Sequence, residues 1–412
     1  MGDETMSRKS KKKNAGVEIQ PREPVPYRVW GEEHLDAATL EQMRNACSLP
    51  ISVRGAQMPD GHVGYGLPIG GVLATRNAVI PYAVGVDIAC RMKLTITEVP
   101  GGRLAGWKDK LAKALRHETC FGFGGEFRQE DRRDHEVMED PAWDDLPKQL
   151  HRLKRRAWSQ LGSSGSGNHF AEFGILRMDK PDLGVPPGEY IALLSHSGSR
   201  GFGANVARYY TQIAMENVLL PKHMKHLAWL DLSSAAGQEY WLAMELAGRY
   251  ASANHDLIHR HVLRTAGLSP LFQVENHHNF AWKEIHNGEE LIVHRKGATP
   301  AGEGVLGFIP GSMTDPGFLV RGLGSKASLL SAAHGAGRLM SRSEAKRTFT
   351  GSQLQKALAE AGVELLSAGI DEAPMVYKSL RAIMEAQRDL VEPLAEFQPR
   401  IVLMAAGDRP ED

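Results

Sequence analysis

The sequence predicts an α+β fold: one large domain in which mixed β-sheets are flanked by helices. Helical spacing and strand-like alternation of hydrophobic residues follow one another along the whole chain. The 412 residues, 42% of them hydrophobic, are enough for a large core. Because no internal repeat or linker stands out, we expect residues 20–408 to form one unit. Residues 1–19, which are basic and poor in apolar side chains, are expected to form a mobile tail.

The N-terminal half of this domain begins with an expected helix. Residues 36–47 are amphipathic, and residues 103–117 repeat leucine and tryptophan at helical spacing. Between them, residues 92–99 alternate like a strand. The glycine-rich residues 60–71 look too flexible for regular structure and too apolar for a linker. We therefore expect residues 60–71 to be a loop that lines a site.

The C-terminal half alternates in the same way. Residues 190–195 resemble a buried strand that ends at a loop carrying His196. The longest helix is expected at residues 238–266, followed by strands at 271–275 and 290–294, the second entered through an Asn-Gly turn. An extended segment, two helices and a last strand complete the domain, at residues 317–323, 341–348, 380–389 and 401–404.

Composition and charge limit the partners and the compartment. Lys plus Arg total 49 and Asp plus Glu total 49, so a polyanionic partner must be held by a local basic patch. The 3 cysteines are an odd, sparse set, which argues for a reducing compartment, and we expect the cytoplasm. No apolar run approaches the roughly 18 residues of a membrane span, and the start lacks the apolar core of a signal peptide. The cationic residues 148–156 are expected to be a solvated helix face, with a nucleic-acid backbone contact as the alternative.

His334 lies in the segment Ala333-His334-Gly335-Ala336-Gly337-Arg338, which is typical of a histidine that attacks phosphorus. Gly335 and Gly337 remove the Cβ barrier to unusual backbone angles and leave amide N–H groups free to line an anion site. Arg338 supplies a planar guanidinium fork for phosphate. The segment therefore predicts phosphate chemistry at His334.

Metal-ligand side chains lie in short motifs elsewhere in the chain, at Asp87, Cys90, His169, His196 and His278. Asp87 and Cys90 are three residues apart, so both can face one cation from a turn, and the sulfur can bridge two cations. The histidines lie beside glycine, serine or asparagine, where ring nitrogens are accessible. One such histidine alone is more often an ordinary polar loop residue, but the five ligands together predict a loop-built metal site in the centre of the domain. By ligand chemistry alone, thiolate and imidazole favour zinc.

Several neighbouring residues have two interpretations. Cys90 is a metal thiolate, a buried small hydrophobe or a nucleophile, and we favour the first because no cysteine-protease signature surrounds it. Asp60 and His62 either orient the metal ligands or make ordinary loop hydrogen bonds. Three further cations are either phosphate ligands or members of structural ion pairs: Arg200, Arg295 and Lys296.

Short sequence motifs that together are specific for one protein family are distributed along the chain from residue 58 to residue 374. They are Met58-Pro59-Asp60-Gly61-His62, Val84-Gly85-Val86-Asp87-Ile88-Ala89-Cys90, Gly167-Asn168-His169-Phe170, His196-Ser197-Gly198-Ser199-Arg200, His277-His278-Asn279, Arg295-Lys296-Gly297-Ala298, Pro310-Gly311-Ser312-Met313, His334-Gly335-Ala336-Gly337-Arg338-Leu339-Met340-Ser341-Arg342 and Asp371-Glu372-Ala373-Pro374. On these motifs the chain resembles the RtcB family of RNA-splicing ligases, which join RNA ends with GTP and manganese. The resemblance implies a single RtcB-like catalytic domain over residues 20–408.

The resemblance also implies two manganese ions and one nucleotide. Asp87, Cys90 and His169 would hold one ion, and Cys90, His196 and His278 the other, with Cys90 as the bridge. His334 would attack the α-phosphate of GTP and form a guanylylated histidine. The implied GTP contacts lie in four segments: Asn168, His169, Phe170, Ala171 and Glu172; His278 and Asn279; Pro310, Gly311, Ser312 and Met313; and Gly335, Ala336, Gly337 and Arg338.

The implied substrates are RNAs with a 3′-phosphate or 2′,3′-cyclic phosphate end and RNAs with a 5′-hydroxyl end, joined in RNA splicing or repair. We expect a monomer that needs no membrane, with an archease-like protein as an activator. Three positions depart from the family's pattern. Ala406 stands where relatives typically place a lysine, Gly317 where a serine is expected, and Arg91 where a small residue is usual.

Two other functions fit the same residues. A metal-dependent phosphoesterase would use water where the ligase uses a 5′-hydroxyl, and it would release phosphate without joining ends. An RNA-end binding protein would keep the metals but lack nucleotide use, because of Ala406 and Gly317. We favour the ligase, because His334 and the five metal-ligand residues are all present.

Overall fold

The computed structural model describes residues 16–407, so most of the predicted mobile tail lies outside the described residues. Val17 and Glu18, which form β1, pair in parallel with Val218 and Leu219 of β9. The amide of Ile19 donates to the carbonyl of Leu219 at 2.9 Å. Residues 17–19 therefore belong to the folded body and not to a tail, because their backbone groups are bonded to β9.

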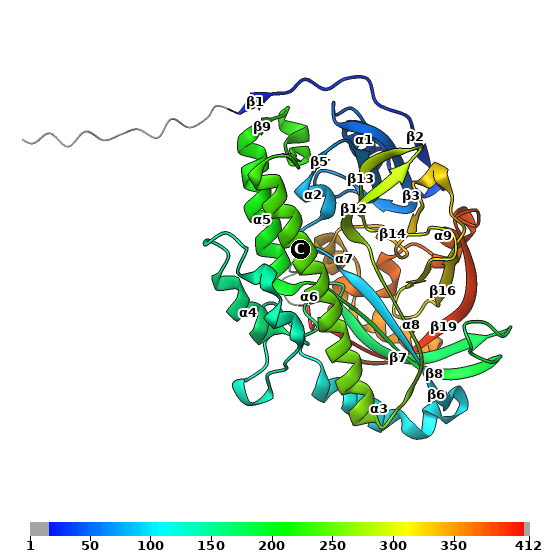
Figure 1. The fold of residues 1–412 in the computed structure, drawn as a ribbon. Coiled ribbons are helices and arrows are strands. Elements are labelled where there is room, and N and C mark those ends of the chain that lie inside the picture. The colour runs from blue at the N-terminus through cyan, green and yellow to red at the C-terminus, as the bar shows by residue number, and fades with distance from the viewer. Residues whose placement is uncertain (1–15, 408–412) are drawn as a thin grey trace, which may run out of the picture.

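Two β-sheets form the centre of the molecule (Figure 1). The 8-stranded sheet has the order β11-β6-β8-β7-β19-β16-β15, with β18 paired to β19. Its strands are β6 (Arg91–Pro100), β7 (Phe170–Met178), β8 (Gly188–Ser197), β11 (Pro270–His277), β15 (Leu306–Ile309), β16 (Gly317–Gly322), β18 (Glu364–Ser367) and β19 (Val391–Met404). The 5-stranded sheet has the order β12-β13-β4-β3-β2, with β2 (Tyr27–Val29), β3 (Ser52–His62), β4 (Ile69–Thr75), β12 (Asn279–His286) and β13 (Glu289–Lys296). Short pairs complete the β-structure: β1 (Val17–Glu18) with β9 (Val218–Leu219), β5 (Ala78–Val79) with β10 (Leu230–Asp231), and β14 (Ala298–Pro300) with β17 (Ser331–Ala333).

Helices cover the outside of these sheets. α5 (Arg200–Asn217) and the long α6 (Ala235–Ala266) pack against each other and run along one flank of the molecule (Figure 1). Their contact is aromatic, with Tyr210 and Tyr240 fully buried in the largest hydrophobic cluster. The other helices are α1 (Ala37–Cys47), α2 (Pro81–Val84), α3 (Leu104–Glu118), α4 (Arg152–Gln160), α7 (Arg342–Thr348), α8 (Gly351–Ala361) and α9 (Leu380–Ala386).

The strongly periodic elements agree with the sequence prediction. α1 begins directly after Asp36, whose side chain caps it by accepting from the amide of Thr39 at 2.7 Å. α6 begins after the cap of Ser234 and ends at Gly267, which has the left-handed conformation. The Asn-Gly turn is also confirmed, because Asn287 and Gly288 have φ of 52° and 82° and join β12 to β13 as a hairpin.

Four boundaries differ from the prediction. Residues 60–71 are a loop only from 63 to 68, since β3 continues to His62 and β4 begins at Ile69. His196 belongs to β8 and not to a loop, because its backbone pairs with neighbours on both sides. The last strand begins at Val391 and not at 401, and α9 ends at Ala386. These differences arise where pairing with distant strands outweighs the local pattern.

The strand register brings the predicted metal ligands together. β11, β6, β8 and β7 are neighbours, with His277 opposite Arg91, Met92 opposite His196, and His196 opposite Phe170. Cys90 precedes β6, His169 precedes β7 and His278 follows β11, so these ligands and His196 all lie at one end of four adjacent strands. Ala298 of β14 pairs with Ala333 of β17 and donates its amide to the carbonyl of His278 at 3.3 Å, so His334, which follows β17, lies near His278.

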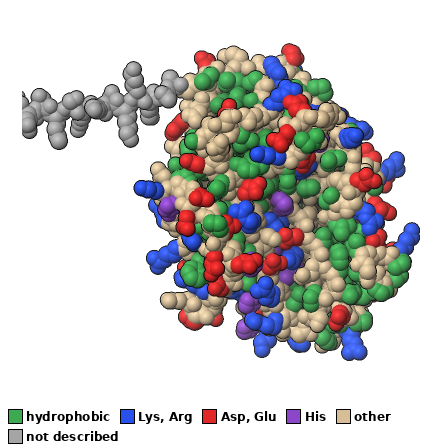
Figure 2. Space-filling model, in the orientation of Figure 1, with side chains coloured by type: hydrophobic (Ala, Val, Ile, Leu, Met, Phe, Trp, Pro, Cys, Tyr) green, Lys and Arg blue, Asp and Glu red, His purple; other side chains and the backbone are tan. Residues whose placement is uncertain are grey.

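The surface matches the balanced composition. Acidic and basic side chains are interspersed on the face of the molecule shown in Figure 2. The predicted cationic face is present in α4, where Arg152 and Arg155 are exposed while Leu153 and Ala157 are buried. Within residues 16–407, none of the helices combines the length and the hydrophobicity that a membrane span requires.

Candidate functional site

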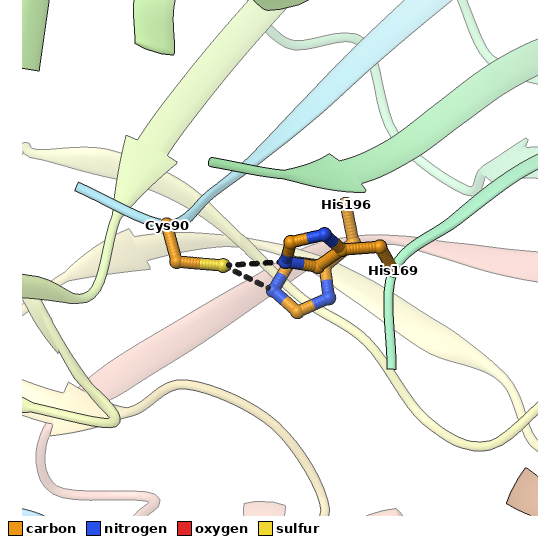
Figure 3. A group of neighbouring side chains, drawn as sticks. All are labelled: Cys90, His169 and His196. Atoms are coloured by element: carbon orange, nitrogen blue, oxygen red, sulfur yellow. Dashed lines mark hydrogen bonds between the residues drawn. The ribbon is translucent and has the colours of Figure 1, made fainter. Parts of the chain in front are cut away.

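The predicted metal ligands form a connected group with Cys90 in the middle, part of which Figure 3 shows. The sulfur of Cys90 lies 3.0 Å from Nε2 of His196 and 3.4 Å from Nε2 of His169. Beyond His169, Oδ2 of Asp87 lies 3.0 Å from the same Nε2. Beyond His196, Nε2 of His278 lies 3.2 Å from Nε2 of His196. The five side chains therefore run from Asp87 to His278 in an order that puts the thiol between two sets of ligands.

The separations of these atoms fit metal coordination. At metal–ligand distances of about 2.0–2.3 Å, two ligand atoms on one ion lie about 3–4 Å apart. The ligand atoms of Cys90, His169 and His196 all lie within 4.8 Å of one another, and all three side chains are buried. A thiol, imidazoles and a carboxylate with converging atoms are a donor set that a divalent transition metal accepts.

Burial keeps these ligands in the protonation states that metals bind. Burial lowers the pKa of His196 to about 3 and lowers that of His278 well below its usual value, so both rings are neutral. Burial alone would raise the pKa of Asp87. The hydrogen bond with His169 and its charge outweigh that effect, and the pKa of Asp87 falls to about 2. Neutral imidazoles and an ionised carboxylate are therefore available.

Hydrogen bonds from outside the group orient its members. Nδ1 of His196 donates to the carbonyl of Asn168 at 3.0 Å, which directs Nε2 toward Cys90. Nη1 of Arg200 lies 3.2 Å from Nδ1 of His169. Nε of Arg200 donates to the hydroxyl of Ser163 at 3.3 Å. Arg200 therefore contacts a metal ligand directly, where the sequence left open a phosphate contact or an ion pair.

His334 lies beside the metal ligands, with its ring centroid 4.8 Å from that of His278. Its Nδ1 is 2.7 Å from Oδ2 of Asp60, a fully buried carboxylate. The same oxygen accepts the backbone N–H groups of His334 at 3.0 Å and Gly335 at 3.3 Å. Because a carboxylate only accepts, Nδ1 is the nitrogen that carries the proton in the neutral ring, which leaves the lone pair on Nε2. Nε2 is the nitrogen that can act as a nucleophile.

This arrangement corrects the expectation that the amide of Gly335 is free, and it decides between the two interpretations of Asp60 and His62. The amide of Gly335 is bonded to Asp60 and is not free for an anion. Gly337 has φ of 76°, and a Cβ there would lie 2.0 Å from the carbonyl oxygen of Asp60, so this position requires glycine. Asp60 orients His334 and contacts none of the predicted metal ligands in hydrogen bonds of the described residues. His62 makes a loop hydrogen bond, with Nδ1 3.3 Å from the carbonyl of Asp60.

A cavity of about 390 Å³ joins the metal ligands, His334 and the predicted nucleotide segments. The predicted site residues line it with the exception of Ala171, which is fully buried in the hydrophobic core. Alternate side chains of β7 face opposite sides of the sheet, so Ala171 points away while Phe170 and Glu172 face the cavity. Burial raises the pKa of Glu172 well above its usual value, which favours its neutral form.

Of three basic residues near the site, two line the cavity and one forms a structural ion pair. Lys296 lines the cavity, its Nζ donates to the carbonyl of Tyr65 at 2.5 Å, and burial lowers its pKa to about 7. Arg295 forms a structural ion pair with Glu284, because its Nη1 donates to Oε1 of Glu284 at 2.6 Å. Arg338 lines the cavity, and its Nη2 donates to the carbonyl of Asp371 at 2.8 Å.

The three departures from the family pattern lie away from the cavity wall. Arg91 donates to Glu275 of β11 and to the carbonyl of Gly248 in α6, both at 2.8 Å, so its guanidinium is held by these two elements. A Cβ at Gly317 would lie 2.5 Å from the ring of Phe308, which explains the absence of a side chain there. Ala406 is exposed.

Some residues that line the cavity escaped the sequence analysis. They lie in the loop after β3, in α2 and near the end of β19: Val63, Tyr65, Tyr82, Val402 and Met404. The glycine-rich character of residues 60–71 indicated that this segment lines a site, but no pattern singled out its side chains.

The family model described as tRNA-splicing ligase RtcB matches residues 42–405 of this chain. The chain belongs to the RtcB family. The RNA-splicing ligase RtcB of Escherichia coli K12 is 33% identical over 410 residues, which cover 91% of this chain and 96% of the relative. The tRNA-splicing ligase RtcB of Nanoarchaeum equitans is 31% identical over 458 residues, covering 92% and 95%. That of Thermococcus kodakarensis is 31% identical over 438 residues, covering 88% and 90%. The RtcB resemblance inferred from the motifs is thereby confirmed.

Proposed function

We propose that this RtcB-family protein is an RNA ligase that joins a 3′-phosphate or 2′,3′-cyclic phosphate end to a 5′-hydroxyl end through a nucleotide bound covalently to His334. Its relatives in Escherichia coli and in archaea carry the names RNA-splicing and tRNA-splicing ligase, which supports a role in RNA splicing or repair. One structural observation carries the mechanism. His334, held at Nδ1 by a buried carboxylate, shares one cavity with five metal-ligand side chains.

The first chemical step takes place at Nε2 of His334. Its lone pair attacks the α-phosphorus of GTP, a nitrogen–phosphorus bond forms, the bond to the bridging oxygen breaks, and pyrophosphate leaves. The imidazole ring becomes positively charged during this step. Asp60, at 2.7 Å from Nδ1 and shielded from water, stabilises that charge and prevents Nδ1 from competing as the nucleophile.

The second half of the reaction transfers the nucleotide to RNA. An oxygen of the RNA 3′-phosphate attacks the phosphorus bound to His334, and the nitrogen–phosphorus bond breaks, which restores the lone pair on Nε2. The 5′-hydroxyl of the second RNA then attacks the activated 3′-phosphorus, loses its proton and forms the phosphodiester, while GMP leaves. A cyclic phosphate is first opened by water to the 3′-phosphate.

We propose two manganese ions for this site. Asp87, Cys90 and His169 would hold one, and Cys90, His196 and His278 the other, in keeping with the central position of the Cys90 sulfur. When bound, such ions supply positive charge that offsets the charge on the attacking and leaving oxygens. The choice of manganese rests on the family, because thiolate and imidazole by themselves favour zinc.

GTP is the proposed nucleotide, and the cavity has the size of a small-molecule site. Glu172 and Ser312 are buried polar side chains in its wall. Burial separates Glu172 and Ser312 from water. Hydrogen bonds with a nucleotide base or sugar would replace the hydrogen bonds with water that these side chains lose. The choice of guanine rests on the family resemblance.

We further propose that the protein works as a monomer in the cytoplasm, with an archease-like activator. One chain supplies all five metal-ligand residues, the nucleophile and the cavity wall. Cys47, Cys90 and Cys120 form no disulfide, as expected in a reducing compartment.

Covalent labelling tests the proposed function. The protein is incubated with manganese and each α-labelled nucleoside triphosphate, the adduct is located by mass spectrometry, and RNA joining is measured with the same sample. We expect GTP to label His334 and His334→Ala to abolish labelling and joining. Joining that survives His334→Ala refutes the mechanism. Phosphate release without joined product indicates the phosphoesterase, and RNA binding without any label indicates the binding protein.

A further inference from the structure

Three aromatic rings lie together at the cavity that contains His334. Tyr65, in the loop after β3, is 65% exposed although it lines this cavity. Tyr82 of α2 also lines the cavity, with its ring centroid 6.0 Å from that of Tyr65. The ring of His226, in the 3-10 helix η6 (Lys222–Leu227), lies 5.5 Å from Tyr65 and 4.9 Å from Tyr82. We call Tyr65, Tyr82 and His226 the aromatic platform.

The loop that carries Tyr65 is anchored at three consecutive residues. Gln42 of α1 bonds both backbone groups of Gly64, donating to its carbonyl at 2.6 Å and accepting from its amide at 3.0 Å. Lys296 donates to the carbonyl of Tyr65 at 2.5 Å. Gly66 packs so closely on η6 that a Cβ there would lie 2.7 Å from the carbonyl oxygen of His226. Tyr65 is thus an exposed ring on a fixed backbone, so the loop needs little further ordering when a ligand binds.

The platform is joined to the nucleophile through the backbone of β13. Lys296, which holds Tyr65, is followed by Gly297, with φ of 59°. A Cβ on Gly297 would lie 3.1 Å from Cε1 of His334. The support of Tyr65 and the contact with His334 therefore come from two consecutive residues, Lys296 and Gly297.

Basic side chains lie next to the platform. Lys222 and Lys225 of η6 are exposed, and the Nζ of Lys296 bonds the backbone of Tyr65. Burial, followed by the charges of Lys225 and Lys296, lowers the pKa of His226. Its ring therefore favours the neutral form, and it meets the rings of Tyr65 and Tyr82 edge to face, at interplanar angles of 85° and 65°. Aromatic faces next to basic side chains are the combination by which proteins bind single-stranded nucleic acid.

We propose that the aromatic platform stacks the terminal nucleobase of a single-stranded RNA end, while Lys222 and Lys225 attract the adjoining backbone phosphates. The proposal rests on the proposed function, because it takes the RNA end to be the group that reaches His334. Every nucleobase has a π face, so stacking on Tyr65 provides affinity without selecting a sequence. Such a site suits an enzyme that must accept different RNA ends.

The test is a binding measurement with two RNAs and four proteins. Fluorescence anisotropy follows a short single-stranded RNA with a 3′-phosphate, with its terminal base present or replaced by an abasic unit, in manganese without nucleotide. The proteins are the wild type, Tyr65→Ala, Tyr65→Phe and Ile285→Ala. Ile285 is the matched control, because it is 66% exposed in the β12–β13 hairpin and does not line the cavity.

Tyr65→Ala is expected to weaken binding of the intact RNA by at least about fivefold, the lower end of base–aromatic stacking. Tyr65→Phe keeps the ring and should bind like the wild type, as should Ile285→Ala. On the abasic RNA, Tyr65→Ala should bind like the wild type, because the stacking partner is gone. Equal affinity of Tyr65→Ala and wild type for the intact RNA overturns the proposal. An equal loss on both RNAs also overturns it, because Tyr65 would then act on something other than the base.

Labelling of wild-type His334 by GTP distinguishes failure of the ligase proposal from failure of the aromatic-platform proposal. A labelled wild type whose RNA affinity is independent of Tyr65 supports the ligase and overturns the platform. An unlabelled wild type whose affinity depends on Tyr65 and on the terminal base supports the platform and overturns the ligase.

Discussion

Asp60→Asn is expected to slow the formation of the His334 adduct without removing the hydrogen bonds that position it. Oδ2 of Asp60 accepts from Nδ1 of His334 at 2.7 Å and from the backbone amides of His334 and Gly335 at 3.0 and 3.3 Å. The oxygen of an asparagine can accept the same three hydrogen bonds. The substitution therefore removes the negative charge opposite Nδ1, a charge that also acts on Lys378 and His62, and it places an amide NH2 at the buried position of Oδ1.

The expected slowing of His334 labelling can be worked out from the loss of that negative charge. A hydrogen bond to a charged group contributes about 1.5–3 kcal/mol and a neutral one about 0.5–1.5 kcal/mol, so the charge of Asp60 stabilises the charged ring of the transition state by about 1–1.5 kcal/mol. The ring gains positive charge as the nitrogen–phosphorus bond forms, and Asp60 is fully buried, so its attraction to the ring grows with little screening by water. Since about 1.4 kcal/mol corresponds to a factor of ten, we expect labelling to be about 10- to 100-fold slower.

The assay is single-turnover labelling from α-labelled GTP at saturating manganese. Metal content and thermal unfolding of the variant serve as controls, and both should be close to those of the wild type, because Asp60 bonds none of the predicted metal ligands. A labelling rate within about twofold of the wild type, with metal content unchanged, would refute the reasoning that Asp60 stabilises the charged ring.

Two further predictions concern the metal ligands and the cavity wall. A Cβ at position 198 would lie 2.2 Å from Oδ1 of Asp87, so Gly198→Ala should displace this carboxylate and weaken manganese binding by about 10- to 100-fold in equilibrium dialysis. Gly106→Ala is the control, because nothing lies within 4 Å of a Cβ there, and equal affinities of the two variants would contradict the prediction. Burial raises the pKa of Glu172 well above the usual 4.5, so the folded protein binds a proton that the unfolded chain releases, and stability is lost as the pH rises above 4.5. In metal-free and nucleotide-free protein, Glu172→Gln should therefore raise the unfolding temperature at pH 8 and have little effect near pH 4, and a gain independent of pH would count against the assignment.

Local patterns predicted the most periodic helices well, missed α5 and α8, and set the strand limits less well. The periodicity of residues 36–47 and 238–266 is a property of consecutive residues, and α1 and α6 follow it closely. The glycines of residues 60–71 indicated a loop, yet residues 60–62 and 69–71 lie in strands. A strand is decided by its neighbours in the sheet, and those neighbours are distant in sequence.

The sequence by itself determined which family the chain belongs to, and it predicted which side chains carry the chemistry. His334, the five metal-ligand residues and the RtcB motifs are local patterns of residue type, and such patterns are visible without a fold. Only the tertiary structure decided which groups act on one another. It placed Asp60 under His334, across 274 residues, turned Arg91 toward α6 and buried Ala171 in the core. These contacts depend on sheet order, strand register and the alternation of side chains across a sheet, which bring together residues that no local pattern connects.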